Sequence, residues 1–304
     1  MALTVVLALC AALSNASASV LQRRAASVGE PEKTAGAVRR LGRLLRRADW
    51  LAGVGLLMLS AVLQGSALAV GSLSLVQPLL AAELLFTLVV GSLVFRRRPE
   101  RRTWLAFAAL AVGLALFLVA AAPAAGRTEA PVRAWLVGGG AACGAVVLLV
   151  LAARPCRGAS RAVLLGLASA VCFALTAALL KQAVGRLAHG PGAMFTHWSP
   201  YATAVTGLLA FLLLQSALSA GSLAASQPAL TLGDALTSIA LGAAVFEESI
   251  QLGLRVIPEI AGIALIGAGS VGLAHASSEG RGWDTPGERK PEGNGAHIPM
   301  GHEH

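Results

Sequence analysis

Nine long stretches of this chain contain almost no charged residue, and the charges crowd between them. A stretch of about 20 apolar residues is long enough to cross the hydrocarbon core of a bilayer. Because lipid offers the backbone no hydrogen-bonding partner, apolar stretches of this length must be helices. The sequence therefore predicts an all-α membrane protein, a polytopic bundle of nine transmembrane helices. We expect them at residues 2–21, 50–70, 73–95, 103–122, 134–153, 162–184, 198–219, 222–245 and 255–275.

The composition of the chain excludes an ordinary soluble protein. Of the 304 residues, 56% are hydrophobic and 13% are charged, whereas a soluble chain carries about 25% charged residues. The net charge of +9 would suggest nucleic acid in a soluble protein, but the cytoplasmic loops of membrane proteins also collect Lys and Arg. We therefore expect the lipid bilayer as a partner and no nucleic acid. The four cysteines have no metal-ligand spacing and imply no disulfide framework.

Lysine and arginine are distributed unevenly over the connections. The connections after the first, third, fifth and seventh stretches, together with the C-terminal tail, hold 19 of the 24. The positive-inside rule then places the N-terminus outside and the tail in the cytoplasm, as in a multi-pass protein of the cell membrane. Trp50, Trp104, Trp135 and Trp198 each lie at the start of a stretch, a position that suits an indole at the membrane interface.

The first stretch has a second interpretation, a cleaved signal peptide, because Ala16-Ser17-Ala18 resembles a cleavage site. No positive charge precedes this stretch and eight follow it closely within loop 22–49, which favours a retained span. In the same loop, AVRRLGRLLRRADW (37–50) fits either a short helix on the inner leaflet or a solvated basic loop.

An internal repeat organises the chain. ALAVGSLSLVQPLL (67–80) and ALSAGSLAASQPAL (217–230) are identical at eight of fourteen positions, and LALCAALSNASASVLQRRA (7–25) aligns with LGLASAVCFALTAALLKQA (165–183). Because five stretches separate the start of the first unit from the start of the second, the second unit enters the membrane the opposite way round. We expect tight turns at the two Gly-Ser pairs and an inverted repeat of 4+1+4 helices. The units are a first repeat at 1–122, a linker at 123–161, a second repeat at 162–275 and a disordered cytoplasmic tail at 276–304.

Inverted repeats are typical of secondary transporters, whose substrate site lies near the midplane where the repeats meet. Pro78 and Pro228 remove a backbone donor, which predicts a bend or an opening of the third and eighth helices near one end. Gln77 and Gln227, directly before these prolines, either satisfy the carbonyls that proline frees or face a cavity.

Two carboxylates lie near the middle of predicted helices, Glu83 and Asp234. A charge at the bilayer centre is costly, so the two mark a transport pathway or form a buried structural hydrogen bond. We expect Glu247 and Glu248, in contrast, to be solvated. Gln227, Thr231, Asp234 and Ser238 share one helical stripe. The expected pathway residues are Asn15, Gln64, Gln77, Glu83, Gln215, Gln227, Thr231, Asp234 and Ser238.

The halves resemble the drug/metabolite transporter superfamily, whose EamA-type members are duplicated, inverted helical bundles. The resemblance rests on a span with a proline, an acidic turn, VFEES (245–249), and a Gly-rich closing helix, IAGIALIGAGSVGL (260–273). The first half has VFRRRPE (94–100) in place of the acidic turn. With nine spans and the basic stretch VLQRRAA (20–26) after the first, the chain is also similar to the NIPA-type magnesium transporters.

These observations predict a secondary transporter for a small metabolite, a drug-like solute or a cation, with proton coupling through Glu83 or Asp234. Magnesium transport is the alternative that the second resemblance implies. The chain has no nucleotide-binding loop, and we expect no cofactor, no resident metal and no enzyme activity.

An intramembrane aspartyl protease would need a second aspartate within the spans. A structural or partner-binding membrane protein is a further class, and the tail histidines His297, His302 and His304 could catch a metal.

Overall fold

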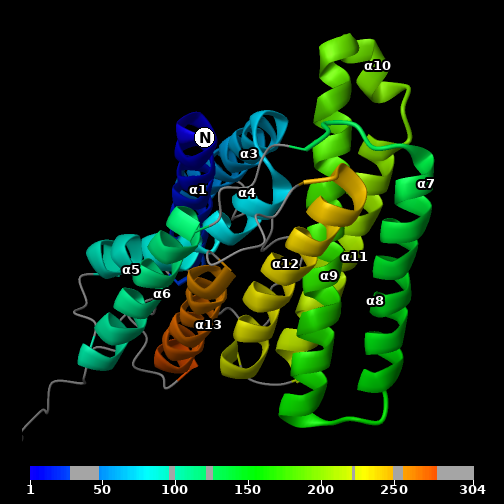
Figure 1. The fold of residues 1–304 in the computed structure, drawn as a ribbon. Helices are drawn as coiled ribbons and strands as arrows, with labels where there is room; N and C mark the ends of the chain where they lie inside the picture. Colours follow the sequence, from blue (N-terminus) through cyan, green and yellow to red (C-terminus); the bar gives the residue numbers. More distant parts are fainter. Residues whose placement is uncertain (28–47, 96–99, 121–125, 221–222, 249–255, 279–304) are drawn as a thin grey trace, which may run out of the picture.

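The computed structural model describes residues 1–27, 48–95, 100–120, 126–220, 223–248 and 256–278, and these residues form helices joined by short connections, without a strand. In chain order the α-helices are α1 (Ala2–Ser27), α3 (Ala48–Val70), α4 (Leu73–Leu80), α5 (Ala82–Phe95), α6 (Arg101–Ala120), α7 (Val132–Ala134), α8 (Gly140–Ala153), α9 (Gly158–Gly185), α10 (Pro191–Phe195), α11 (Ser199–Ala220), α12 (Leu223–Phe246) and α13 (Val256–Ser278). A π-helix, η1 (Trp135–Gly139), and a 3₁₀-helix, η2 (Arg186–His189), complete the set (Figure 1).

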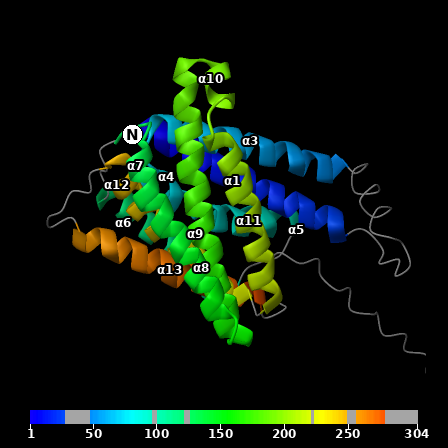
Figure 2. The same cartoon turned by 90° about the vertical axis from the view of Figure 1, so that its right-hand side faces the viewer.

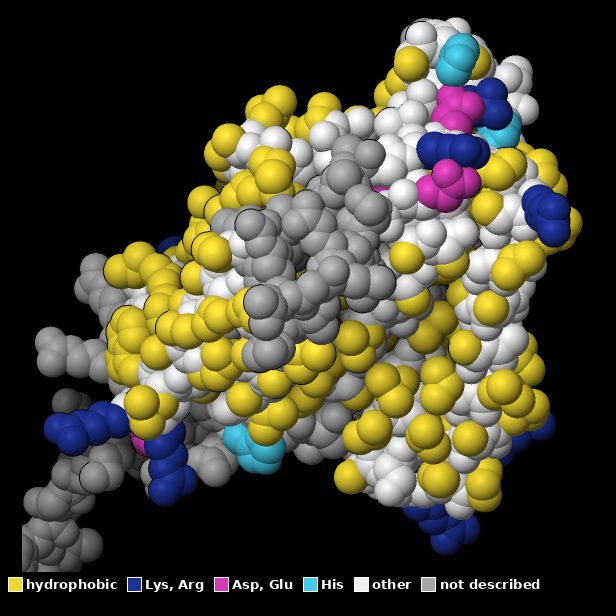
Figure 3. All heavy atoms as spheres, viewed as in Figure 1, with side chains coloured by type: hydrophobic (Ala, Val, Ile, Leu, Met, Phe, Trp, Pro, Cys, Tyr) yellow, Lys and Arg dark blue, Asp and Glu magenta, His cyan; other side chains and the backbone are white. Residues whose placement is uncertain are grey.

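The described residues include seven helical stretches that are long and apolar enough to cross a membrane. The helices at the two other predicted positions are α6, of 20 residues, and α13, whose apolar part is Ile260–Leu273. Apolar side chains cover much of the lower half of the face shown in Figure 3, and charged side chains gather at its upper right and along its lower edge. This is the surface of an all-helical, multi-pass membrane protein. The seven stretches are Ala2–Ala25, Ala48–Val70, Leu73–Phe95, Val132–Ala153, Gly158–His189, Ser199–Ala220 and Ser226–Phe246.

The helices pack in corresponding pairs in the two halves of the chain. In the first half α1 packs along α3, and in the second half α9 packs along α11. The next helices follow the same pattern, since α1 also contacts α4 and α5 while α9 contacts α12. In Figure 2 α1 and α3 run across the view, whereas α8, α9 and α11 run from top to bottom, so the two helix groups cross steeply. Helix α9 is the most buried of the seven apolar stretches and lies against α3, α4, α8, α11 and α12.

The two repeated prolines lie at equivalent places in their helices. Helix α4 begins at Leu73 and α12 at Leu223, so Pro78 and Pro228 are each the sixth helical residue. After Pro78 the helix is interrupted at Ala81, whose amide donates to the carbonyl of Pro78, and a separate helix α5 follows. Helix α12 continues through Pro228 without a break. The predicted opening is therefore found in the third helix and not in the eighth.

The turn predicted at Gly71-Ser72 is present between α3 and α4. A side chain at Gly71 would overlap Thr4 of α1, so glycine lets the end of α3 approach α1 closely. The equivalent pair at 221–222 lies outside the described residues.

Helices α6 and α13 join the two halves along a line of glycines. A Cβ at Gly113 would lie 2.7 Å from the backbone nitrogen of Ile266, and one at Gly262 would lie 2.8 Å from the backbone nitrogen of Phe117. A Cβ at Gly269 would lie 2.6 Å from the backbone nitrogen of Leu110. Small residues of this kind let helices in membranes approach backbone to backbone. We call this contact the glycine seam.

Candidate functional site

Asp234, which is half-buried, and Ser238, which is buried, each have an inaccessible oxygen atom on α12. The Oδ1 atom of Asp234 and the hydroxyl of Ser238 have no hydrogen-bonding partner among the described residues. They are one helical turn apart, on the side of α12 opposite the exposed Leu236 and Ala240. A buried polar atom normally has a partner, so two adjacent unpaired oxygens make this part of α12 a candidate binding position.

The rest of the predicted stripe continues along the same face of α12. The side chains of Gln227 and Thr231 are half-buried, and the Thr231 hydroxyl donates to the carbonyl of Gln227 over 3.1 Å. This local bond satisfies Thr231 within its own helix. Asp234 and Ser238 are therefore the unsatisfied part of the stripe.

Glu83 and Asn15, two further predicted residues, are brought together by α5 and α1. The amide of Asn15 donates a hydrogen bond of 2.6 Å to the Glu83 carboxylate. One turn further along α5, the hydroxyl of the buried Thr87 donates to the carbonyl of Glu83 over 2.7 Å. Both Glu83 and Asn15 are half-buried. Glu83 thus differs from Asp234, because it has a protein partner.

The remaining predicted residues lie in different surroundings. Gln77 is buried on α4 directly before Pro78. Gln64 is half-buried on α3, and Gln215 is exposed on α11. The structure groups the candidates by helix and does not gather all of them at one point.

Glu248 is buried, and its predicted solvation is wrong. Its side chain is 0% exposed and forms an ion pair with Lys181 of α9, which is 1% exposed. The same carboxylate accepts hydrogen bonds from the backbone amides of Leu73, over 2.6 Å, and Ser74, over 2.9 Å, and from the Ser74 hydroxyl. These amides belong to the first turn of α4, where a helix presents unpaired N–H groups and favours an anion.

The end of α12 directs Glu248 inward. Glu247 has φ 52, the only positive φ of a non-glycine residue in the described ranges, and it turns the chain back over the helix end. The amide of Glu248 then donates to the carbonyl of Gly242 over 3.0 Å. A Cβ at Gly242 would overlap the Glu248 carboxylate and the Ser74 hydroxyl, so only glycine leaves room for them. Glu247 itself is exposed, as predicted, and pairs with Arg127 over 3.1 Å.

Aromatic and polar groups surround the ion pair. The ring of Phe246 lies 4.7 Å from the Lys181 ammonium, a cation–π distance. Trp135 is buried and packs edge-on against Phe246 and Trp198. Its indole donates to Gln182, the residue after Lys181, over 3.4 Å. The π-helix η1 begins at Trp135, and such segments frequently occur at functional sites.

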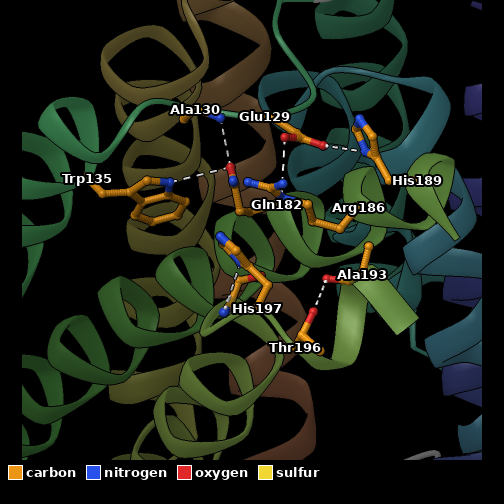
Figure 4. A network of polar contacts seen from close by, with 10 residues as sticks. Glu129, Ala130, Trp135, Gln182, Arg186, His189, Ala193, Thr196 and His197 are labelled. Carbon is orange, nitrogen blue, oxygen red and sulfur yellow. Dashed lines mark hydrogen bonds and ion pairs between the residues drawn. The ribbon is translucent and has the colours of Figure 1, made fainter. Parts of the chain in front are cut away.

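A second polar network lies beyond this point, at the end of α9 (Figure 4). Gln182 accepts from the amide of Ala130 over 2.8 Å, and Glu129 pairs with Arg186 over 3.3 Å and with His189 over 3.2 Å. Nearby, burial and the charge of Arg186 lower the pKa of His197, while Glu129 opposes this shift. The network ties segment 126–131 to the end of α9.

An apolar hollow of about 540 Å³ opens at the same end, between α1, α3 and the end of α9. None of the predicted pathway residues lines it. Its lining is Leu7, Ser66, Ala69, Val70, Thr128, Val184, Gly185, Leu187 and Ala188. The described residues contain no group of three His, Cys, Asp or Glu that could hold a metal ion. The tail histidines His297, His302 and His304 lie outside them.

Sequence reasoning missed the pair of Lys181 and Glu248. One signal was present, because Lys181 is the only charged residue of the stretch 162–184. A lysine near the end of an apolar stretch also fits an interfacial position, and its partner is 67 residues away.

Comparison with known proteins finds a relative of this chain, and the name of that relative states no activity. The chain is 31% identical over 256 residues to the "Uncharacterized protein Cgl0250/cg0304" of Corynebacterium glutamicum, covering 82% of this chain and 86% of that protein. No family model and no solved structure matches the chain.

Proposed function

We propose that this chain, which belongs to the family of the uncharacterized protein Cgl0250/cg0304 from Corynebacterium glutamicum, is a secondary transporter. It moves a small metabolite, a drug-like solute or a cation across the cell membrane by alternating access. The observation that carries the proposal is the correspondence of the halves. Helices α4 and α12 begin at residues 150 positions apart and carry their prolines at the same place.

The packing of the helices supports an inverted repeat of nine spans. The pair of α1 and α3 corresponds to the pair of α9 and α11, and α6 packs on its own counterpart α13. A helix that contacts its repeat equivalent lies at the symmetry axis, as expected if a twofold rotation in the membrane plane relates the halves. Two similar halves can exchange conformations, and the site between them then opens to one side or the other. In our proposal the N-terminus is outside and the tail in the cytoplasm.

The transport pathway in this proposal runs along α12 and α5. Asp234 lies near the middle of α12 and has an unpaired oxygen beside the unpaired hydroxyl of Ser238. Glu83 lies near the middle of the span formed by α4 and α5 and is held by Asn15. A carboxylate within the membrane is costly and usually marks a substrate or proton pathway. We assign proton or cation binding to Asp234, with Glu83 as the second carboxylate.

Solute uptake by the purified protein in liposomes tests this function. The panel comprises radiolabelled amino acids, nucleosides and sugars and the fluorescent cation ethidium, each with and without a pH gradient. Wild type is compared with Asp234→Asn, which removes the charge and keeps the shape. Asp49→Asn is the matched control, because Asp49 pairs with Arg24 over 3.7 Å at the exposed start of α3. Uptake that is lost in Asp234→Asn and kept in Asp49→Asn supports the proposal. Wild-type liposomes that take up nothing, or full pH-dependent uptake by Asp234→Asn, contradict the function or the assignment of Asp234.

A further inference from the structure

We infer that the ion pair of Lys181 and Glu248, seated on the first turn of α4, is a latch that must open during transport. It is defined by Lys181, Glu248, Leu73 and Ser74, and we call it the Glu248 latch. The inference rests on the proposed function, because alternating access requires the two ends of the molecule to open in turn.

The latch joins the two halves of the chain through a single carboxylate. Lys181 and Glu248 belong to the second half, whereas Leu73 and Ser74 belong to the first. Three donors from α4 and the ammonium of Lys181 all meet on Glu248. If this carboxylate moves away, the first turn of α4 loses its hydrogen-bond acceptor. All of these contacts between the two halves are then broken together.

Helix α4 is suited to move as a short unit. It has eight residues, and the interruption at Ala81 separates it from α5. Its N-terminal end is held by Glu248 and its C-terminal end follows Pro78 within two residues. A half-helix of this kind, with its N-terminus on an anionic group, is a common element of transporter sites.

The glycine seam, in contrast, is a contact between backbones. Gly113 and Gly262 bring the backbones of α6 and α13 together. We therefore expect the seam to stay packed while the latch opens. In a variant without the latch, a residue at the latch should become exposed while a residue in the glycine seam stays buried. General unfolding would expose both residues.

The strength of the bonds on Glu248 determines how far their loss should shift the opening equilibrium. The bonds on Glu248 are charge-assisted and buried, which makes them stronger than neutral surface bonds. Glu248→Gln removes the counter-ion of Lys181 and directs an amide N–H₂ group toward donors. Loss of bonds of this kind shifts the opening equilibrium by about 10-fold or more.

A cysteine at position 72 reports the opening. Ser72 directly precedes α4, is 2% exposed, and its hydroxyl has no partner among the described residues, so Ser72→Cys breaks no bond. The measurement is the rate at which a maleimide reacts with this thiol in the full-length protein in nanodiscs, where both faces are accessible. The native cysteines Cys10, Cys143, Cys156 and Cys172 are first replaced by alanine.

The latch variants are Glu248→Gln and Lys181→Met, and Ser74→Ala is a milder one that removes a single hydroxyl donor. Glu247→Gln is the matched control, because it removes the neighbouring carboxylate, which is exposed. A second reporter, Ala106→Cys, lies buried in the glycine seam against Gly272 and reports unfolding of the whole bundle.

We expect the reaction at position 72 to become about 10-fold faster or more in Glu248→Gln and Lys181→Met, with a smaller increase in Ser74→Ala. It should be unchanged in Glu247→Gln, and the thiol at position 106 should stay protected throughout. Equal rates at position 72 in all variants would overturn the inference. Acceleration at both reporters would also overturn it, because the pair would then only stabilise the fold.

The labelling needs no solute, so it is independent of the transport assay. A latch that opens as expected in a protein that moves no solute leaves the conformational inference standing and removes the transporter. Solute uptake together with equal labelling rates in all variants would support the transporter and overturn the latch.

Discussion

The amide of Asn15 on α1 and the carboxylate of Glu83 on α5 are 2.6 Å apart and joined by a hydrogen bond. Asp234 on α12 has an unpartnered Oδ1 atom instead. The two carboxylates are therefore in opposite energetic situations, because a neighbour satisfies Glu83 while the Oδ1 atom of Asp234 has no partner among the described residues. Substitutions at the two positions should separate stability from function.

Replacement of Glu83 by leucine should destabilise the protein. The variant leaves the Asn15 amide without its acceptor, and an unpaired buried polar group costs about 1–3 kcal/mol. Glu83→Gln keeps a hydrogen-bonding side chain of the same size and should retain most of the stability, while it can no longer bind a proton or a cation as a charge. Equilibrium unfolding in detergent measures the free energies, and the liposome assay measures transport. Equal stability of Glu83→Leu and wild type would contradict the structural role of the bond.

The opposite outcome is expected at Asp234. Asp234→Leu removes an oxygen that has no partner, so the free energy of unfolding should stay constant or rise by about 1 kcal/mol. Transport should nevertheless be lost, because the carboxylate is no longer there to bind. Asp234→Asn should fold normally and lose pH-dependent uptake, with a stronger effect than Glu83→Gln. A large loss of stability in Asp234→Leu would show that this carboxylate has a structural partner.

The glycine seam predicts a sharp contrast between two Gly→Ala variants. A methyl group at Gly113 would lie 2.7 Å from the backbone nitrogen of Ile266 and 2.8 Å from the carbonyl of Gly262. Gly113→Ala should therefore lower the free energy of unfolding by about 1–3 kcal/mol, the usual cost of overpacking. Gly144 in α8 has no atom within 4 Å of its added Cβ, so Gly144→Ala should be neutral or stabilising by up to about 1 kcal/mol. Equal melting temperatures for the two variants would contradict the close contact of α6 and α13.

Membrane orientation is the fourth prediction. The distribution of Lys and Arg over the loops predicts an external N-terminus and a cytoplasmic tail. A reporter that is active only in the cytoplasm should be active when it is fused to the C-terminus and inactive when it is inserted into loop 122–133. The reverse pattern would invert the orientation and would place the Glu248 latch on the cytoplasmic side.

Local sequence was sufficient to predict the helices, because apolar length alone determines what can cross a bilayer. Seven predicted spans coincide with long apolar helices, and helices also form at the positions of the fourth and ninth. The interruption at Ala81 follows from a proline that the sequence displays. Pro228 in the equivalent position causes no break, so a proline alone does not decide whether a helix opens.

The candidate site was predicted only in part. Buried polar residues in apolar stretches are visible in a sequence, and two of those expected in the pathway, Asn15 and Glu83, do contact each other. The burial of Glu248 was not predictable in this way. Its partners on α4 lie 174 and 175 residues away, and an acidic residue after a helix end is normally solvated. Its burial depends on a tertiary contact that local sequence does not encode.

The Lys181–Glu248 pair joins the two halves at one place, on the first turn of α4. Lys181 aligns with Arg23, and the glutamates of VFEES (245–249) align with arginines of VFRRRPE (94–100), so the corresponding positions of the first half carry cations on both sides. Like charges repel where opposite charges attract. The matching positions of the two halves thus differ in charge, and only those of the second half can form an ion pair. In the proposed carrier, the end that Glu248 joins is therefore the end that is closed before any solute binds.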